Sequence, residues 1–282
     1  MTRRLRQSLA EKLPAKTLES VFNSYDIVGD IAIVRLTKTA EKHSRSIAGA
    51  LLNARRNVKT VLAQTSPVHG DFRTRDLKFV AGENRTTTTN AESGCKFRID
   101  LATVYFSPRL SHERMRVASL VRPRETVVNM FAGVGCFSII VAKHSDVAKV
   151  FSVDLNPEAV RLMRENIRLN GVFGKVVPVL GDAREVIRTR LRNAADRVLM
   201  PLPGKSLEYL PDAVSALKKK DGWIHCYFFE HARTGEGAVE KARQEVTKLD
   251  SLHASFEIQH GRVVRSTGPH WFQIALDIRA LG

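Results

Sequence analysis

The amino-acid sequence predicts an α/β protein whose main β-sheet is largely parallel, is closed by an antiparallel hairpin and follows a smaller α/β domain. From about Ser111 onwards, short apolar runs alternate with helical segments, a pattern typical of parallel strand–helix–strand units. Near the C-terminus, residues 256–265 and 271–278 resemble two strands joined by a Ser-Thr-Gly-Pro turn. The first hundred or so residues lack this alternation. We therefore expect two domains, residues 1–108 and 109–282.

The first domain is predicted to contain a small sheet and one basic helix. Residues 25–36 indicate a strand pair about Gly29-Asp30, and residues 40–56 have helical apolar spacing with a basic face. Residues 83–94 are polar and rich in turn formers. Further strands are predicted at 61–64, 77–82 and 95–101. The basic residues are dispersed between these elements, which favours a binding face over a disordered tail.

The second domain is predicted to begin with a helix from Ser111 to Val121, with Ser111 as its N-terminal cap. Residues 157–171 indicate a helix with a proline near its start and Asn-Gly at its end. Apolar runs predict five parallel strands at 127–131, 150–155, 176–180, 197–200 and 223–229. With the C-terminal hairpin, they match the seven-stranded sheet of class I Rossmann-like methyltransferases.

A glycine-containing turn, Phe131-Ala-Gly-Val-Gly135, follows the first of these strands. Glycines there let the backbone approach a ligand closely. Asp154 ends the second strand and Asp182 the third, where carboxylates can accept hydrogen bonds from ribose hydroxyls and an adenine amino group. The full Gly-x-Gly-x-x-Gly spacing of a nicotinamide dinucleotide site is absent, so S-adenosylmethionine is the predicted cofactor. The plainer interpretation makes both aspartates helix caps.

The cofactor contacts expected from these strand ends and the loop after the fourth strand form one set. They are Phe131, Gly133, Gly135, Asp154, Leu155, Asp182, Ala183 and Pro201.

The chain carries a formal net charge of +16 and has an isoelectric point near 10.2. Such an excess attracts polyanions and makes nucleic acid the leading partner, the alternative being a solvated basic surface without a ligand. Cys95, Cys136 and Cys226 are scattered, so we expect neither a disulfide framework nor a metal site. The sequence lacks a signal-peptide core and any run of about 18 apolar residues. We expect a cytoplasmic protein without a membrane partner.

Three further segments complete a recognisable set of motifs: Gly70-Asp-Phe-Arg-Thr-Arg-Asp76, Tyr105-Phe-Ser-Pro-Arg-Leu-Ser-His-Glu-Arg-Met-Arg116 and Met200-Pro-Leu-Pro-Gly204. With the Phe131–Gly135 turn and Glu165-Asn-Ile-Arg-Leu-Asn170, they resemble the archaeal and eukaryotic tRNA (guanine(37)-N1)-methyltransferases. The resemblance runs from about residue 20 to the C-terminus. It implies a small RNA-contacting domain before the methyltransferase domain, the tRNA anticodon stem-loop as partner, and a monomer. The chain looks like a short form without the family's extra N-terminal domain.

The resemblance also implies residue roles that fit the chemistry. Guanine N1 bears a proton, so a base must remove it during methyl transfer, and negative charge then develops on O6. By position, Glu113 matches the general base and Arg73 the group that steadies O6 and the phosphate. Arg75 and Arg109 would hold the target nucleotide. Pro201, Leu202 and Pro203 would wall the guanine pocket.

Each role has a plainer alternative. Glu113 in the first turn of a helix meets the helix dipole favourably, as exposed glutamates commonly do. Arg73 and Arg75 could be general phosphate contacts, and Pro201 and Pro203 could simply end a loop.

Two residues depart from the expected patterns. Many members of the family carry asparagine at the place of Pro201, and class I methyltransferases often carry an acidic residue at the place of Asn129.

Two rival functions remain open at this point. One is a related enzyme of wyosine biosynthesis that transfers a methyl or aminocarboxypropyl group to a modified guanosine 37. The other is a catalytically silent tRNA-binding protein with a vestigial cofactor pocket, against which the near-complete set of cofactor carboxylates argues.

Overall fold

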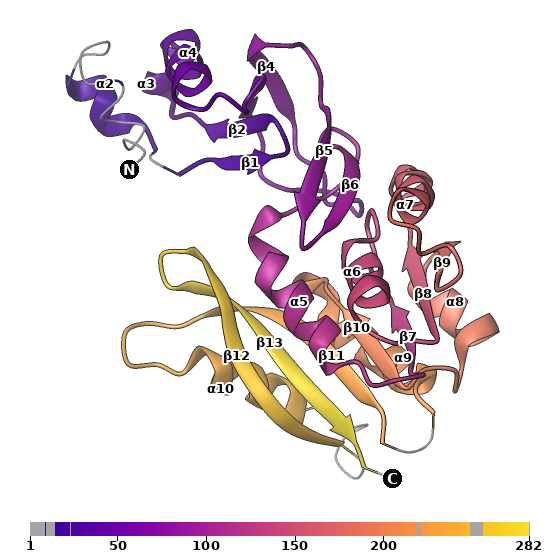
Figure 1. Ribbon diagram of the computed structural model, residues 1–282. Coiled ribbons are helices and arrows are strands. Elements are labelled where there is room, and N and C mark those ends of the chain that lie inside the picture. The colour runs from indigo at the N-terminus through magenta and orange to yellow at the C-terminus, as the bar shows by residue number, and fades with distance from the viewer. Residues whose placement is uncertain (1–8, 10–14, 23, 219–220, 249–255, 282) are drawn as a thin grey trace. The chain divides into compact units, whose positions relative to one another are not determined.

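The structure, a computed structural model, describes residue 9 and residues 15–22, 24–218, 221–248 and 256–281. The chain divides into two compact units, Met1–Pro108 and Arg109–Gly282 (Figure 1). Each unit has its own hydrophobic core and is described by itself below.

A four-stranded sheet forms the centre of the first unit, in the order β1-β2-β3-β4. Its strands are β1 (Asp26–Val28), β2 (Ile31–Arg35), β3 (Thr60–Gln64) and β4 (Leu77–Gly82). Strands β1 and β2 form the expected antiparallel pair about Gly29, which has a φ of +56°, whereas β2 and β3 are parallel. The helices are α2 (Ala15–Ser20), α3 (Lys38–Glu41) and α4 (Ser44–Ala54). Helix α4 packs its apolar residues into the core beside this sheet.

The single helix predicted over residues 40–56 is wrong, because the chain forms two helices there. Thr37 Oγ1 accepts a hydrogen bond from the Ala40 N–H at 3.2 Å and starts α3 early. The His43 N–H then donates to the Ala40 carbonyl at 3.0 Å, which closes the chain into a tight turn before α4. Hydrophobic periodicity alone does not reveal a break that depends on a cap and a turn.

A separate hairpin of β5 (Thr87–Glu92) and β6 (Cys95–Asp100) completes the first unit. Strand β6 alternates buried and exposed residues as predicted. The expectation of an irregular segment at 83–94 missed β5, whose three consecutive threonines are β-branched and suit a pleated strand.

The second unit contains the predicted seven-stranded sheet, in the order β12-β13-β11-β10-β7-β8-β9. Five strands are parallel: β7 (Thr126–Asn129), β8 (Lys149–Asp154), β9 (Val176–Leu180), β10 (Arg197–Met200) and β11 (Trp223–His231). Strand β13 (Trp271–Ala280) is antiparallel both to β11 and to β12 (Phe256–Gly268). The predicted class I fold with its C-terminal hairpin is therefore confirmed.

Most helices of the second unit pack against strands of the sheet. Helix α6 (Cys136–His144) lies against β8 and β9, α7 (Pro157–Leu169) against the same two strands, and α9 (Ser206–Ala216) against β10 and β11. Helix α5 (Ser111–Leu120) packs on α6, and α10 (Ala238–Thr247) on the C-terminal strands. The shorter elements are η1 (Pro108–Leu110), α8 (Ala183–Val186), η2 (Ile187–Leu191) and η3 (Pro203–Lys205). None of the described helices is long and apolar enough to cross a membrane.

The strand order reverses at β7, which lies between β8 and β10. In open α/β sheets, ligands bind outside the carboxyl ends of the strands at such a switch point. The carboxyl end of β7 leads directly into the Phe131–Gly135 turn. The topology thus selects this turn as the place to look for a site.

The two edge strands of this sheet are both irregular. Strand β12 forms one edge, and its pairing with β13 shifts register three times, the last shift falling between Ser266 and Gly268. Strand β9 forms the other edge and contains Pro178, which pairs in register with Ser152 of β8.

A glycine substitution in the turn tests how tightly this region is packed. Gly135 has a φ of +91°, and a Cβ atom there would lie 2.8 Å from Met163 Cγ, whereas Gly171 has a φ of +68° with open space around it. Gly171→Ala should lower the free energy of unfolding by about 1 kcal/mol through backbone strain. Gly135→Ala should lower the free energy of unfolding by about 1 to 3 kcal/mol more than Gly171→Ala does, because the added Cβ also overpacks against α7. Urea denaturation of both variants measures the difference. Equal losses of unfolding free energy would show that α7 shifts to accommodate the Cβ atom without destabilising the fold.

Candidate active site

The Phe131–Gly135 turn is joined to the neighbouring strand by Asp154. The Gly133 N–H donates to Asp154 Oδ2 at 2.6 Å, and Gly133 has a φ of +56° that favours glycine. Gly135 is the residue before α6, and its missing side chain makes room for Met163. Close packing against Met163 is therefore one reason for a glycine at position 135, and the predicted contact with a cofactor stays a prediction.

Asp154 ends β8 with both carboxylate oxygens engaged by the backbone. Besides the Gly133 contact, Oδ1 accepts the Asn156 N–H at 2.9 Å. Burial raises the pKa of Asp154, and these two backbone hydrogen bonds act in the opposite direction. The alternative that Asp154 caps a helix is wrong, because the side chain of Asn156 caps α7. Each Asp154 oxygen has taken one hydrogen bond and can accept a second.

Asp182 combines a capping role with a contact to an aromatic residue that the sequence did not single out. Its Oδ1 accepts the Arg184 N–H at 2.8 Å as the cap of α8, so the capping alternative holds here. Its Oδ2 accepts the Tyr209 hydroxyl at 2.9 Å. The Tyr209 ring meets Phe131 edge-on, with centroids 5.1 Å apart. Burial, together with Asp182, raises the pKa of Tyr209 to about 12, so this hydroxyl remains a donor.

Asn129, which stands where an acidic residue was expected, braces the turn from inside the protein. It is fully buried, its Nδ2 donates to Ser138 Oγ of α6 at 3.1 Å, and its Oδ1 accepts the Phe131 N–H at 3.3 Å. Leu155, the residue after Asp154, is 46% exposed at the same edge, whereas Ala183 is buried. The exposed apolar side chain and the two carboxylates give this edge the mixed character that an adenosine moiety requires.

Glu113 occupies the first turn of α5 with its side chain only 1% exposed. Arg116 donates to both carboxylate oxygens, at 2.7 Å to Oε1 and 3.0 Å to Oε2. The Tyr227 hydroxyl donates to Oε1 at 2.8 Å, and Arg262 Nη1 lies 3.7 Å from Oε2. The plain alternative of an exposed glutamate at a helix start is wrong. Helix α5 itself begins after Leu110, and Ser111 is its first residue instead of its predicted cap.

Arg116, itself half-buried, links Glu113 to a series of buried ionisable groups, which we call the buried charge chain: Glu113, Arg116, Asp277, His225, Arg197 and Glu125. Arg116 Nη1 donates to Asp277 Oδ2 at 2.6 Å. His225 bridges Asp277, at 2.5 Å from Nδ1, and Arg197, at 2.6 Å from Nε2. Arg197 then forms a bidentate pair with Glu125 at 2.7 and 3.0 Å. The buried charge chain connects α5 with β13, β11 and β10.

The contacts of His225 determine its protonation state. A guanidinium has no acceptor, so the Nε2 that faces Arg197 must carry a lone pair, and Nδ1–H donates to Asp277. Burial lowers the pKa of His225, Arg197 and Arg116 add to this effect, and Asp277 opposes it. Burial alone would raise the pKa of Asp277, yet hydrogen bonds from His225 and Arg116 lower it well below its usual range. The folded protein therefore holds a neutral histidine beside a carboxylate.

The Pro201-Leu202-Pro203 loop follows β10 and is half-buried. The Leu202 N–H donates to the Met200 carbonyl at 2.8 Å, which bends the chain sharply at Pro201. Ser206 Oγ bonds the Leu202 carbonyl at 3.2 Å and the Tyr227 carbonyl at 2.5 Å. The loop is thus held against the same residue of β11 that contacts Glu113.

The predicted arginines divide between the two units. Arg109 lies exposed in η1, directly before α5. In the first unit, Arg73 has a left-handed φ of +57° in a turn closed by the His69 N–H and the Thr74 carbonyl at 2.9 Å. Arg75 Nη1 donates to Gln64 Oε1 at 3.3 Å. A non-glycine residue in the left-handed region is uncommon and marks this turn for attention.

The sequence missed Tyr209, Tyr227, His225 and Asp277. For the last two a signal existed, since His225 and Asp277 interrupt otherwise apolar strand segments, and buried polar side chains require partners. The two tyrosines gave no comparable signal, because tyrosine is common in strands and helices alike. Among the residues that the structure describes, no group of three or more His, Cys, Asp or Glu could hold a metal ion.

A seven-stranded sheet with an antiparallel C-terminal hairpin, a glycine turn at its switch point and a carboxylate on the next strand are the features of class I S-adenosylmethionine-dependent methyltransferases. A sequence model of the TRM5/TYW2 methyltransferase domain matches residues 88–252, and one of the TYW2 N-terminal domain matches residues 5–86. The chain belongs to the TRM5/TYW2 methyltransferase family.

The curated relatives carry more than one activity. The tRNA (guanine(37)-N(1))-methyltransferase Trm5b of Pyrococcus abyssi is 40% identical to this chain in sequence. The matched region covers 91% of this chain and 74% of Trm5b. The tRNA 4-demethylwyosine(37)-methyltransferase Taw21 of Saccharolobus solfataricus is 34% identical to this chain. The matched region covers 93% of this chain and 95% of Taw21. The family resemblance drawn from the motifs is therefore right, and the family is broader than the N1-methylating enzymes alone.

Solved structures agree with this placement. The complex of aTrm5 with tRNALeu has a TM-score of 0.85 and 32% identity, covering 99% of this chain and 79% of that chain. Methanocaldococcus jannaschii TYW2 in complex with AdoMet has a TM-score of 0.63 and 25% identity, covering 92% of this chain and 100% of that chain. The predicted cofactor, S-adenosylmethionine, is thereby confirmed as that of the family.

The neutral His225 gives a prediction for the pH dependence of stability. Its pKa is lowered on folding, so the unfolded chain binds a proton that the folded chain does not, and stability falls as the pH drops below about 6.5. The slope from this group approaches about 1.4 kcal/mol per pH unit. Urea denaturation between pH 7 and 5 should show this slope in the wild type and in His260→Asn, an exposed control, but not in His225→Asn. An unchanged slope in His225→Asn would contradict the assignment.

Proposed function

We propose that this protein methylates N1 of guanosine 37 in tRNA, next to the anticodon, with S-adenosylmethionine as the methyl donor. One observation carries the proposal: the unit that holds the Gly133–Asp154 cofactor turn also holds a buried carboxylate, Glu113, fixed by Arg116 and Tyr227. A methyltransferase acting on a protonated ring nitrogen needs such a group. The similarity to Trm5b of P. abyssi supports the choice of reaction.

Asp154 is suited to hold the ribose of the cofactor, because its two oxygens can each accept one more hydrogen bond from a pair of neighbouring hydroxyls. Asp182 and Leu155 would contact the adenine, and Phe131, packed on Tyr209, would close the adjoining side. When bound, S-adenosylmethionine supplies an electrophilic methyl group on a sulfonium sulfur.

Glu113 would take the proton of guanine N1. The N1–H bond breaks as the N1–carbon bond forms, the proton goes to Glu113, and the electron pair of the broken carbon–sulfur bond stays on sulfur. Both oxygens of Glu113 are engaged in the present structure, by Arg116 and Tyr227. Binding of the base must therefore displace one of these contacts, and Arg116 can retain its pair with Asp277 when this happens.

The remaining predicted residues would position the nucleotide. Arg73 would steady the charge that develops on O6, Arg75 and Arg109 would contact phosphate, and the Pro201-Leu202-Pro203 loop would wall the guanine. The net charge of +16 supports an RNA substrate and predicts affinity that falls with salt. We further propose that the protein works as a cytoplasmic monomer without a metal ion.

A second candidate is a wyosine-pathway enzyme that modifies a guanosine 37 derivative. It is favoured by the match of residues 5–86 to the TYW2 N-terminal domain and by the full-length similarity to Taw21. Pro201, which stands where the family resemblance implies an asparagine, also lacks a side-chain donor for the edge of an unmodified guanine.

Product analysis separates the two candidates. The protein is incubated with S-adenosylmethionine and an unmodified tRNA transcript, and the nucleoside digest is examined by mass spectrometry. We expect 1-methylguanosine at position 37 and none when that base is replaced. An aminocarboxypropyl adduct, or product only on tRNA that already carries 4-demethylwyosine, would favour the second candidate.

The general-base role makes a prediction that a structural role does not. Glu113→Gln should slow single-turnover methyl transfer by about 100-fold or more at neutral pH, while cofactor affinity stays nearly constant. The loss should shrink at alkaline pH, because N1 then ionises without help. Rapid-quench rates across a pH series provide the measurement.

Two variants serve as controls for that experiment. Asp154→Ala should weaken cofactor binding about ten-fold or more without alkaline recovery of the rate. Glu125→Gln removes another carboxylate of the buried charge chain, so it should lower stability without the same change in pH profile. A pH-independent rate loss in Glu113→Gln would refute the base role.

A further inference from the structure

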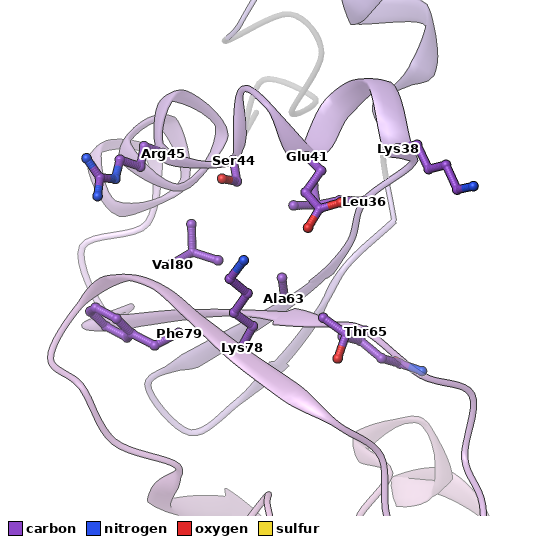
Figure 2. Close-up of a pocket in the computed structure, with 11 residues that line it drawn as sticks. Leu36, Lys38, Glu41, Ser44, Arg45, Ala63, Thr65, Lys78, Phe79 and Val80 are labelled. Atoms are coloured by element: carbon purple, nitrogen blue, oxygen red, sulfur yellow. The ribbon is translucent and has the colours of Figure 1, made fainter.

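The first unit contains a cavity of about 540 Å³ between helices α3 and α4 on one side and strands β3 and β4 on the other (Figure 2). Leu36, Ala63 and Val80 contribute apolar atoms to its lining. Its volume falls within the range of sites that bind small molecules or single residues of a polymer. No residue of the proposed active site lines it.

Cations gather around this cavity. Lys38, Arg45 and Lys78 line it, and Glu41 is its one acidic residue. Within the part of the chain that the structure describes, none of the three cations makes an ion pair. Figure 2 shows them on different elements, with Lys78 extending from β4 toward the helices and with the ends of Lys38 and Arg45 pointing outward. The lining is thus both apolar and cationic, which suits a ligand with a flat apolar part and an anionic part.

A β-bulge in β4 lies beside an exposed aromatic ring in the lining of the cavity. Val61 of β3 pairs with Ala81 of β4, but Leu62 pairs with Phe79, so Val80 is the extra residue. Lys78 and Phe79, the two residues before the bulge, are both exposed, whereas Val80 and Ala81 both pack against the core of the unit. Phe79 is 38% exposed. Bulges often re-aim side chains next to functional sites.

We infer that this cavity binds one unstacked nucleotide of the tRNA, with its base against Phe79 and its phosphates near Lys78 and Arg45. The inference rests on the proposed tRNA substrate and adds a second point of RNA contact to it. Aromatic rings bind unpaired bases of any sequence by stacking, and lysine and arginine neutralise the phosphates beside them.

Affinity for an unmodified tRNA transcript, measured by fluorescence anisotropy over a range of salt concentrations, tests the inference. Phe79→Leu keeps the apolar volume but removes the ring, and it should weaken binding about 5- to 100-fold with an unchanged salt dependence. The double variant Arg45→Gln/Lys78→Gln should reduce the magnitude of the slope of log affinity against log salt concentration by about 1.4 to 1.8. This is the change expected for two lost phosphate contacts.

Matched controls exclude a general surface effect. Phe22 is exposed in the same unit and Lys59 is an exposed cation there, and neither lines the cavity. Phe22→Leu and Lys59→Gln should change affinity and slope much less than the cavity variants. Equal effects of the control and cavity variants would overturn the inference, as would saturable binding of AMP or GMP that leaves tRNA affinity unaltered.

The outcome is separable from that of the proposed function. The cavity variants should retain the wild-type single-turnover rate at saturating tRNA, because they lie outside the catalytic residues. If all cavity variants kept normal methyl transfer and unchanged tRNA affinity, the nucleotide site would be refuted. The proposed function would not be affected by that result. Absence of any transfer by the wild type would instead refute the proposed function.

Discussion

The arrangement of the second unit depends on the double ion pair of Arg116, which holds Glu113 of α5 and Asp277 of β13 at once. Ions withdrawn from water are stable only when each has a partner, so the loss of one member of the buried charge chain leaves the others uncompensated. The buried charge chain continues from Asp277 through His225 and Arg197 across the sheet. It therefore determines where α5 lies, and with it where the candidate base lies.

Tyr227 joins two parts of the candidate site that come from distant segments. Its hydroxyl contacts Glu113, and its carbonyl accepts Ser206, which also holds the Leu202 carbonyl. One residue of β11 thus fixes both the candidate base and the loop proposed to wall the guanine. A shift of this strand would move both together, which preserves their spacing.

Local signals in the sequence predicted the sheet, its hairpin and the cofactor turn, because apolar runs, glycines and strand-end carboxylates report on their own surroundings. The sequence could not identify the buried charge chain, since Arg116 and Asp277 are 161 positions apart and only the fold brings them together. It also did not show that Asn156 would cap α7 in place of Asp154. The spacing of Glu113 and Arg116 was a local signal of one of its pairs, as residues three apart on a helix can pair.

The irregular edges of the seven-stranded sheet have a consequence for the solubility of the protein. An exposed strand edge offers free backbone groups to which a strand of another molecule can add. The three register shifts of β12 bend that edge away from a regular ladder, and Pro178 removes a donor from β9 at the other edge. Both ends of the sheet are therefore poor templates for a further strand, and this protects a large parallel sheet, a slow-folding architecture, from edge-to-edge aggregation.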